Sequence, residues 1–262
     1  MSNATFDLSG KVALITGGNG GIGLGMAEAV AAAGANVAIW GTNPDKNAAA
    51  KETLLAYGIE AESYVCDVSD REQVNSTMAD TLARFGRVDG CFANAGVSSG
   101  RNIRSFLDIT PEEWRRVMSV NLDGTFYTYQ AVLTHMVERA GQGDPGGRLV
   151  AVSSLASISG AELNEHYAAT KGGLNAMTFA LATEYARFGI TANAILPGWI
   201  ETDMTAKAIG NEKFADVVGK RIPARRWGTP KDFAGLAVYL MSDASSYHTG
   251  QLLQVDGGYW RY

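Results

Sequence analysis

The stretch KVALITGGNGGIG, residues 11–23, carries the strongest prediction of the fold. Its first half is a short apolar run, which is typical of a buried strand. Its second half is rich in glycine, so the backbone can turn tightly and bring the amides of a following helix close to a pyrophosphate. The spacing Gly17-x-x-x-Gly21-x-Gly23 also fits a purely structural turn, and no Lys-Ser/Thr pair follows it as in a P-loop. Its position between a strand and a helix favours a dinucleotide site.

The same alternation of apolar runs and amphipathic segments continues along the chain. The apolar runs predict strands at Lys11–Thr16, Asn36–Trp40, Ala61–Cys66, Val88–Ala93, Arg148–Ser153, Thr191–Leu196 and Leu252–Val255. The segments between them predict helices at about 22–33, 44–57, 70–85, 111–139, 165–188 and 230–242. Near-continuous apolar strands separated by helices indicate a parallel sheet covered on both faces. At 262 residues, the chain suits one α/β domain, 1–262, better than two.

Two segments depart from this alternation. Residues 141–147 are rich in glycine and proline, which predicts an exposed loop between a helix and a strand. Residues 203–222 show weaker periodicity between two segments that contain glycine and proline. We therefore expect a mobile helical flap at 203–222, near the substrate.

Composition excludes several classes of function. The net charge of -5 and the absence of a basic run argue against nucleic acid as a partner. No apolar run reaches the ~18 residues that span a membrane, and the first residues lack a signal-peptide pattern, so we expect a cytoplasmic protein. The two cysteines, Cys66 and Cys91, do not suggest a disulfide framework. His135, His166 and His248 lie far apart in the sequence, so we expect no metal site.

Tyr167, Lys171 and Ser154 are the candidate catalytic residues. Tyr167 and Lys171 are four residues apart and so share one face of a helix. An ammonium beside the phenol is expected to lower its pKa from about 10 toward neutrality, which suits acid–base chemistry. Ser154 would hydrogen-bond the same substrate oxygen. An isolated Tyr-x-x-x-Lys is usually a surface pair, and the adjacent His166, about 100° around the helix, is expected at the solvent or the rim.

The residues after the second predicted strand bear on the choice between NAD and NADP. An acidic residue at this point binds the ribose 2′-hydroxyl and repels a 2′-phosphate. Here Thr42 and Asn43 follow the strand, and the first carboxylate is Asp45. This favours NADP slightly, although Lys46 is the only basic residue nearby. Thr42 and Asn43 suit either head group, and a turn into the next helix explains them equally well.

Taken together in this order, the motifs from Lys11 to Gly258 resemble the short-chain dehydrogenase/reductase family, in its Tyr-x-x-x-Lys branch. The matching segments are Thr16–Gly23, Cys66-Asp67-Val68, Ala93-Asn94-Ala95-Gly96, Val120-Asn121-Leu122, Ser153-Ser154, Tyr167 with Lys171, Pro197–Thr202 and Asp256-Gly257-Gly258. Ala93 departs from the Asn that the family has at this position. The resemblance implies a Rossmann-type, doubly wound sheet of seven parallel strands and hydride transfer at C4 of a nicotinamide.

The resemblance also assigns residues to roles. It implies that Asn121 holds a water linking Lys171 to solvent, which completes a catalytic set with Ser154, Tyr167 and Lys171. The implied contacts to the cofactor are Gly17, Asn19, Gly20, Gly21, Ile22, Gly23, Thr42, Asn43, Asp67, Val68, Asn94, Ala95, Gly96, Tyr167, Lys171, Pro197, Gly198, Ile200 and Thr202. Ser154, Leu155, Trp199 and Met204 are candidate substrate contacts, although burial in the core explains the last three equally well.

We therefore predict an NAD(P)-dependent enzyme that interconverts a small secondary alcohol and a ketone. The chain also resembles 3-oxoacyl-carrier-protein reductases, for which a basic docking patch is expected; the candidates are Arg101, Arg104, Arg221, Arg225 and Arg226. A sugar or sugar-acid dehydrogenase is a comparable alternative, and Arg101 and Arg104 could then hold a substrate carboxylate or phosphate. A cofactor-binding sensor without turnover is a remote alternative, since no member of the catalytic set is missing.

The resemblance further implies a homo-oligomer, specifically a homotetramer. The aromatic end Gly258–Tyr262 suits burial between subunits, although it could instead fold back on its own chain.

Overall fold

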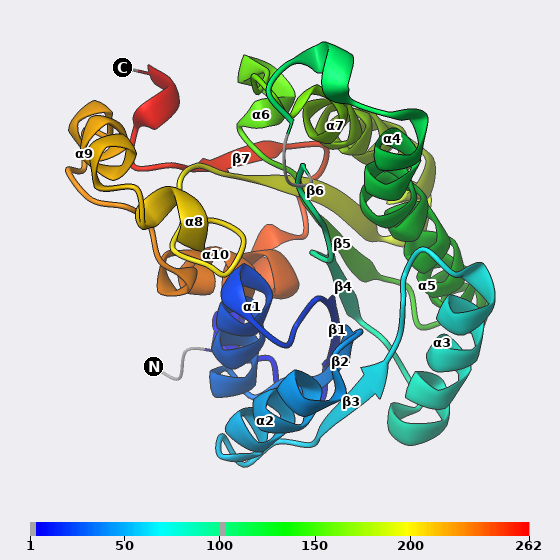
Figure 1. Ribbon diagram of the computed structural model, residues 1–262. Helices are drawn as coiled ribbons and strands as arrows, with labels where there is room; N and C mark the ends of the chain where they lie inside the picture. Colours follow the sequence, from blue (N-terminus) through cyan, green and yellow to red (C-terminus); the bar gives the residue numbers. More distant parts are fainter. Residues whose placement is uncertain (1–3, 100–102, 262) are drawn as a thin grey trace.

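The computed structural model describes residues 4–99 and 103–261 of the chain. Its centre is a seven-stranded sheet in which every neighbouring pair is parallel, in the order β3-β2-β1-β4-β5-β6-β7 (Figure 1). The strands are β1 Val12–Thr16, β2 Asn36–Gly41, β3 Ala61–Val65, β4 Gly90–Ala93, β5 Gly147–Val152, β6 Ile190–Pro197 and β7 Leu252–Val255. The predicted α/β class with a doubly wound parallel sheet is confirmed.

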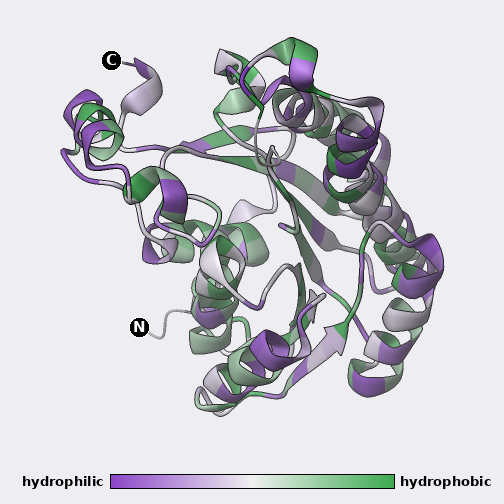
Figure 2. Ribbon diagram, viewed as in Figure 1, coloured by the Kyte–Doolittle hydropathy of each residue, from purple (hydrophilic) through white to green (hydrophobic). Residues whose placement is uncertain are grey.

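Helices cover both faces of the sheet (Figure 1). One face carries α1 Gly21–Ala32, α2 Pro44–Leu55 and α10 Ala234–Met241; the other carries α3 Arg71–Phe85, α5 Gly124–Gly141 and α7 Glu165–Tyr185. Strand residues alternate between the two cores: Leu14 packs toward α5, while Ala13 and Ile15 pack toward α1. The outer helices, such as α3, show hydrophilic and hydrophobic stretches in turn (Figure 2).

The helix predicted at 111–139 is interrupted. It consists of α4 Pro111–Met118, a π-helical turn η3 at Ser119–Asp123, and α5. Periodicity alone could not show the interruption, because a π-turn adds one residue without changing the residue types. Such turns often lie at functional sites, and this one contains Asn121.

The remaining elements are short. They are α6 Ala156–Ser159, α8 Ala206–Ile209, α9 Glu212–Arg221, and 3-10 turns η1 Ala4–Phe6, η2 Phe106–Asp108, η4 Ala186–Phe188, η5 Pro230–Phe233, η6 Asp243–Ser245 and η7 Tyr259–Arg261. Helices α8 and α9 lie in the predicted flap and form a lobe beside β7 and α10 (Figure 1). None of the helices in 4–99 and 103–261 combines the length and hydropathy needed to cross a bilayer.

The chain end, through Arg261, lies against its own fold. Tyr259 and Trp260 are half-buried and pack on the core under α7. The guanidinium of Arg221, at the end of α9, lies 4.3 Å from the centre of the Tyr259 ring. These contacts match the folded-back alternative, and burial of this end between subunits stays a prediction.

The sheet order changes direction between β1 and β4, which lie side by side although β2 and β3 come between them in sequence. In open parallel sheets ligands bind outside the carboxyl ends of the strands at such a switch point. Gly17 and Asn94 directly follow β1 and β4, so the two motifs of the predicted cofactor site meet here.

Candidate active site

Lys171 is a buried cation beside the carboxyl end of β5. Its side chain is only 3% exposed, and its Nζ donates a hydrogen bond of 2.7 Å to the carbonyl of Val152. Nζ lies 5.5 Å from the centre of the Tyr167 ring, one helical turn away on α7. Burial disfavours the charged ammonium and lowers the pKa of Lys171 from 10.5 to about 8.

Tyr167 does not have the lowered pKa that the sequence predicts. Burial raises the pKa of the phenol above 10, and its hydrogen bond with Ser154 offsets only part of the increase. The prediction counted the attraction to Lys171 and left out desolvation, which dominates here. The structure therefore holds Tyr167 as a neutral phenol at neutral pH, able to donate a proton.

Ser154 stands where β5 ends and the chain turns into α6. Its Oγ accepts a 3.1 Å hydrogen bond from the Ala156 amide and also meets the Tyr167 hydroxyl. The neighbouring Ser153 donates a 3.0 Å hydrogen bond to the carbonyl of Lys171. These contacts tie β5 to α7, so the three predicted catalytic residues Ser154, Tyr167 and Lys171 lie together.

Asn121 is fully buried in the π-turn, next to the same group. Its Oδ1 accepts a 2.8 Å hydrogen bond from the Val97 amide, and its Nδ2 donates to the Val97 carbonyl at 2.9 Å and to Thr170 Oγ1 at 3.2 Å. A Cβ added at Gly96 would lie 3.2 Å from Asn121 Oδ1 and 3.5 Å from Lys171 Nζ. The Asn121 side chain is thus fully engaged in holding the segment after β4 against α7, a contact to Val97 and Thr170 that no sequence pattern signals.

The glycine-rich turn between β1 and α1 is packed around Asn94. The side-chain Nδ2 of Asn94 donates hydrogen bonds to the carbonyls of Thr16 and Gly17, both at 3.1 Å. A Cβ at Gly23 would lie 2.2 Å from the Gly17 carbonyl oxygen, so only glycine allows this approach. Gly20 is the N-cap of α1 and offers no side chain to the first helical amides. These amides face outward with the positive end of the helix dipole, as anion sites do.

The other predicted cofactor contacts surround this turn. Thr42 and Asn43 are exposed after β2, and Asn43 caps α2 by accepting a 2.9 Å hydrogen bond from the Lys46 amide. Asn19 donates a 2.7 Å hydrogen bond to Asn47 of α2. Asp67, after β3, accepts hydrogen bonds from Ser69.

The segment after β6 reaches the glycine-rich turn from the opposite side. Gly198 pairs with Val255, and Ile200 is buried. A Cβ on Gly21, which has a φ of +51°, would lie 3.2 Å from Thr202 Cγ2. The rest of the predicted set, Ile22, Val68, Ala95 and Pro197, belongs to these same segments, and the cofactor roles of all these residues stay predictions.

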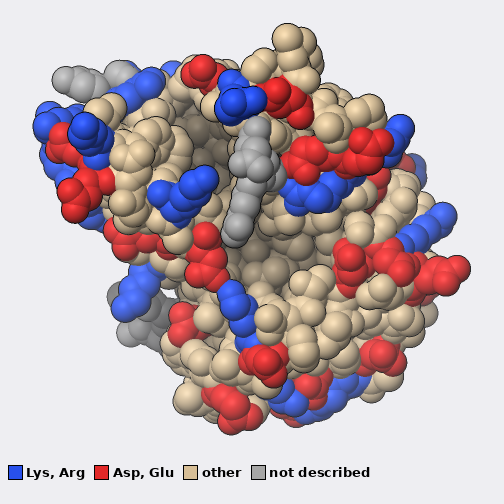
Figure 3. Space-filling model, in the orientation of Figure 1, with Lys and Arg blue, Asp and Glu red and all other residues tan. Residues whose placement is uncertain are grey.

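The candidate substrate contacts differ in burial. Leu155 is buried, Met204 is 49% exposed, and Trp199 packs edge-on against Phe214 of α9 and Trp227, with ring centres 5.2 and 5.4 Å apart. The aromatic cluster fixes α9 over the carboxyl edge of the sheet. A hollow lies in the middle of this face beside the lobe of α8 and α9, with acidic and basic side chains at its rim (Figure 3).

His166 is fully buried, so its expected place at the rim was wrong. Its Nε2 lies 3.4 Å from Glu113 Oε1, because α4 packs on the first turns of α7 and covers the ring. Glu113 forms two hydrogen bonds with Arg116, whose Nη2 also donates to the Ser98 carbonyl at 2.7 Å. The only sequence signal for this network was the Glu113–Arg116 pair at i,i+3.

The candidate arginines do not form one patch among the described residues, and Arg101 lies outside them. Arg104 is 89% exposed in the loop before η2, whereas Arg221 is the last residue of α9 and Arg225 and Arg226 follow it in the chain. Arg221 stacks on Tyr259, Arg225 donates to the Lys220 carbonyl, and Arg226 forms two hydrogen bonds with Asp232.

Comparisons with known proteins agree with this arrangement. A family model described as Enoyl-(Acyl carrier protein) reductase matches residues 17–260. The chain is 36% identical to the gluconate 5-dehydrogenase of Gluconobacter oxydans, over 97% of this chain and 96% of that protein. It is also 36% identical to a 3-oxoacyl-[acyl-carrier-protein] reductase of Chlamydia pneumoniae, over 96% and 97%. A gluconate 5-dehydrogenase of Burkholderia cenocepacia, crystallised with NADP and tartrate, superposes with a TM-score of 0.91 at 36% identity, covering 99% of this chain and 98% of that one.

Proposed function

The chain belongs to the short-chain dehydrogenase/reductase family as an NAD(P)-dependent oxidoreductase of secondary alcohols and ketones, and we propose that Tyr167 is its general acid/base and that a small sugar acid is its substrate. The observation that supports this most is the hydrogen-bonded pair of Ser154 and Tyr167 with the buried Lys171 beside it. The group lies at the carboxyl end of β5, which neighbours β4, and Lys171 borders Gly96 in the segment after β4.

The residues around the glycine-rich turn fit a dinucleotide. The first amides of α1 have no capping side chain and no acidic residue in the first turn, which suits a pyrophosphate. Gly17 and Gly23 let the turn pack closely on Asn94, and Gly21 lets Thr202 approach it. Asn94 would steady the turn, Asp67 and Val68 would border an adenine, and Ile200 and Thr202 would face a carboxamide.

In ketone reduction, a bound nicotinamide supplies the hydride to the carbonyl carbon. Tyr167 gives its phenolic proton to the carbonyl oxygen, so that a C–H and an O–H bond form and the alcohol results. Ser154 donates a hydrogen bond to the same oxygen and stabilises its developing negative charge. In oxidation the two transfers reverse, so that the phenolate form of Tyr167 would accept the alcohol proton as the hydride leaves.

Lys171 and Asn121 would act on the proton rather than on the substrate. A charged Lys171 stabilises the phenolate that Tyr167 becomes after proton transfer. Asn121 holds the π-turn beside Lys171, and we propose that this turn carries the water that returns the proton from solvent. Trp199 and Leu155 would line the substrate side, with Met204 at its edge.

Two observations favour a small sugar acid over an acyl carrier protein. Gluconate 5-dehydrogenases recur among the similar proteins, one of them holding tartrate. Of the described candidate arginines, Arg104 lies in a different segment from Arg221, Arg225 and Arg226, and Arg226 is already neutralised by Asp232. Reduction of a 3-oxoacyl-carrier-protein stays the second candidate function because of the 36% identity to the Chlamydia pneumoniae reductase.

The test is a comparison of substrates under one set of conditions. The enzyme is assayed with NADPH and NADH on 5-ketogluconate, on simple ketones and on an acetoacetyl thioester. We expect turnover of the keto acid to exceed that of the thioester at least tenfold, which is about 1.4 kcal/mol of discrimination. Faster turnover of the thioester would reverse the order of the two candidates.

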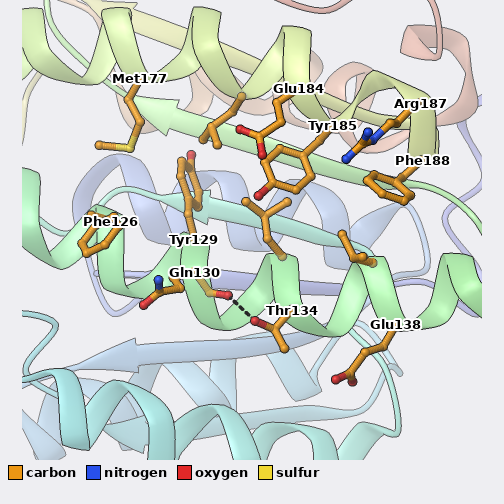
Figure 4. A pocket seen from close by; sticks show the side chains of 13 residues that line it. Phe126, Tyr129, Gln130, Thr134, Glu138, Met177, Glu184, Tyr185, Arg187 and Phe188 are labelled. Carbon is orange, nitrogen blue, oxygen red and sulfur yellow. Dashed lines mark hydrogen bonds between the residues drawn. The ribbon is translucent and has the colours of Figure 1, made fainter.

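We also propose a homotetramer, supported by an apolar groove between α5 and α7 (Figure 4). The groove has a volume of about 580 Å³, and its walls include Phe126, Tyr129 and Met177. Phe126 and Phe179, both 46% exposed, widen the apolar surface on these helices. A second copy would cover this face. Light scattering tests the state, and Phe126→Glu is expected to shift it toward smaller species.

A reducing compartment such as the cytoplasm completes the proposal. Cys66 and Cys91 are both free and buried, and burial raises the pKa of both thiols.

A further inference from the structure

An ion pair joins two segments that are distant in the sequence at the predicted nucleotide site. Lys46 Nζ lies 2.5 Å from Asp203 Oδ2, and the residues are 157 positions apart. Lys46 is in the first turn of α2, directly after β2. Asp203 follows Thr202 and begins the flap, 203–222. The pair therefore connects the β2 side of the site to the flap.

The neighbours of both residues contact the same glycine-rich turn. Asn47, next to Lys46, accepts a 2.7 Å hydrogen bond from Asn19 of that turn. Thr202, next to Asp203, has its Cγ2 only 3.2 Å from the position of a Cβ on Gly21. The ion pair thus lies beside the turn that would hold the pyrophosphate, and not on a remote surface.

The segment after β2 carries one carboxylate, Asp45, and one cation, Lys46. In this fold the residues after the second strand meet the 2′ position of the adenosine ribose. Thr42 and Asn43 are neutral and exposed here, and Lys46 is the one cation in the segment from the end of β2 through the first turn of α2. A 2′-phosphate carries close to two negative charges and strong acceptor oxygens. Lys46 would pair with this phosphate, but in the structure it already forms an ion pair with Asp203.

The pair is readily exchanged. The Lys46 side chain is 54% exposed and that of Asp203 87%, and exposed ion pairs contribute little stability. Binding through the pyrophosphate and adenosine would hold a 2′-phosphate near Lys46 at high effective concentration. A more highly charged anion then displaces the single carboxylate.

We propose that Lys46 determines the preference for a 2′-phosphate and that Asp203 competes with the phosphate for it. NADP exchanges the Asp203 carboxylate on Lys46 for its own phosphate, whereas NAD leaves the ion pair intact. The inference rests on the proposed function, because it requires the nucleotide to bind at the glycine-rich turn. Lys46 then discriminates NADP from NAD, and Asp203 of the flap sets the strength of that discrimination.

The test measures binding of NADP, NAD, 2′,5′-ADP and ADP by titration calorimetry. The variants are Lys46→Met, Asp203→Asn and the double variant. Lys51→Met is the control, because Lys51 lies on the same helix and is paired with Glu62 at 2.6 Å. The difference in affinity between 2′,5′-ADP and ADP measures the contribution of the 2′-phosphate contact without any turnover.

Lys46→Met is expected to weaken NADP and 2′,5′-ADP about tenfold or more, with NAD and ADP within about twofold. Asp203→Asn is expected to tighten 2′,5′-ADP about threefold without affecting ADP. In the Lys46→Met background, Asp203→Asn is expected to have no effect, because competition requires the lysine. Lys51→Met is expected to bind all four ligands as the unsubstituted chain does.

Three results would overturn the inference. They are wild-type affinity of Lys46→Met for 2′,5′-ADP, equal losses in Lys46→Met and Lys51→Met, and the same gain from Asp203→Asn with and without Lys46. The last would mean simple repulsion of the phosphate by Asp203. If the unsubstituted chain bound neither NADP nor NAD, the proposed function itself would fail, so the two failures are distinguishable.

Discussion

Replacing Lys171 with methionine separates the cost of the buried ammonium from its role in catalysis. Methionine has a similar length and no charge, so Lys171→Met keeps most of the packing. It also removes the hydrogen bond that Nζ donates to the Val152 carbonyl at 2.7 Å. The two effects on the free energy of unfolding are opposite in sign.

The magnitude follows from the pKa. Burial lowers the pKa of Lys171 from 10.5 to about 8, which at ~1.4 kcal/mol per pH unit corresponds to about 3 kcal/mol of penalty for the charged form. An unsatisfied Val152 carbonyl costs about 1–3 kcal/mol. At pH 7 we therefore expect Lys171→Met to have a free energy of unfolding within about 2 kcal/mol of wild type, while its activity is lost.

The dependence on pH isolates the charge. Below pH 8 the lysine is protonated in both the folded and unfolded states, so the penalty is fully present in wild type. Between pH 8 and 10.5 the unfolded chain holds the proton and the folded chain does not, so wild-type stability rises with pH. The difference in free energy of unfolding between wild type and Lys171→Met should therefore shift in favour of wild type by about 2–3 kcal/mol from pH 7 to 10.

Urea unfolding at fixed protein concentration, repeated at several pH values, measures this difference. The titrating groups away from Lys171 are common to both proteins, so their contributions largely cancel. A difference that stays constant from pH 7 to 10, or that shifts toward the variant, would refute the claim that Lys171 carries a desolvation penalty.

Three further predictions concern the same site. Tyr167→Phe is expected to lower turnover by about 10²–10⁴-fold, as for the loss of a general acid, with nucleotide affinity within about twofold; retained turnover would remove Tyr167 from the reaction. Gly23→Ala is expected to lower the Tm and weaken NADP binding, because its Cβ would lie 2.2 Å from a backbone oxygen. Gly20→Ala is the control, because a Cβ at Gly20 has open space and should change the Tm little. Equal changes of the Tm in the two variants would contradict the steric argument. His166→Phe removes the 3.4 Å contact between Nε2 and Glu113 Oε1 and is expected to lose about 1–2 kcal/mol of unfolding free energy, whereas His166→Gln, whose amide can replace Nε2, is expected to lose about half of that. Urea unfolding measures the stability of both His166 variants. A His166→Gln variant less stable than His166→Phe would contradict the stabilising role of the contact with Glu113.

The strands and most helices were predictable because their signals are local. A run such as 12–15 is apolar throughout, since both faces of the sheet are covered, and the glycines within 17–23 mark the turn that follows β1. The resemblance carried by the order of motifs along the chain then implied the doubly wound topology. Local periodicity could not show the π-turn at Ser119–Asp123 or the hydrogen bonds that Asn121 in this turn forms with Val97.

The sequence by itself determined which residues are available for chemistry, namely Ser154, Tyr167 and Lys171, and their order around one crevice. Only the tertiary structure decided their electrostatic state. Desolvation of Tyr167 and Lys171 depends on the segments that pack around them, and it reversed the expected direction of the Tyr167 pKa. The ion pair of Lys46 with Asp203 likewise forms between distant segments, because contacts across 157 residues leave no trace in local spacing.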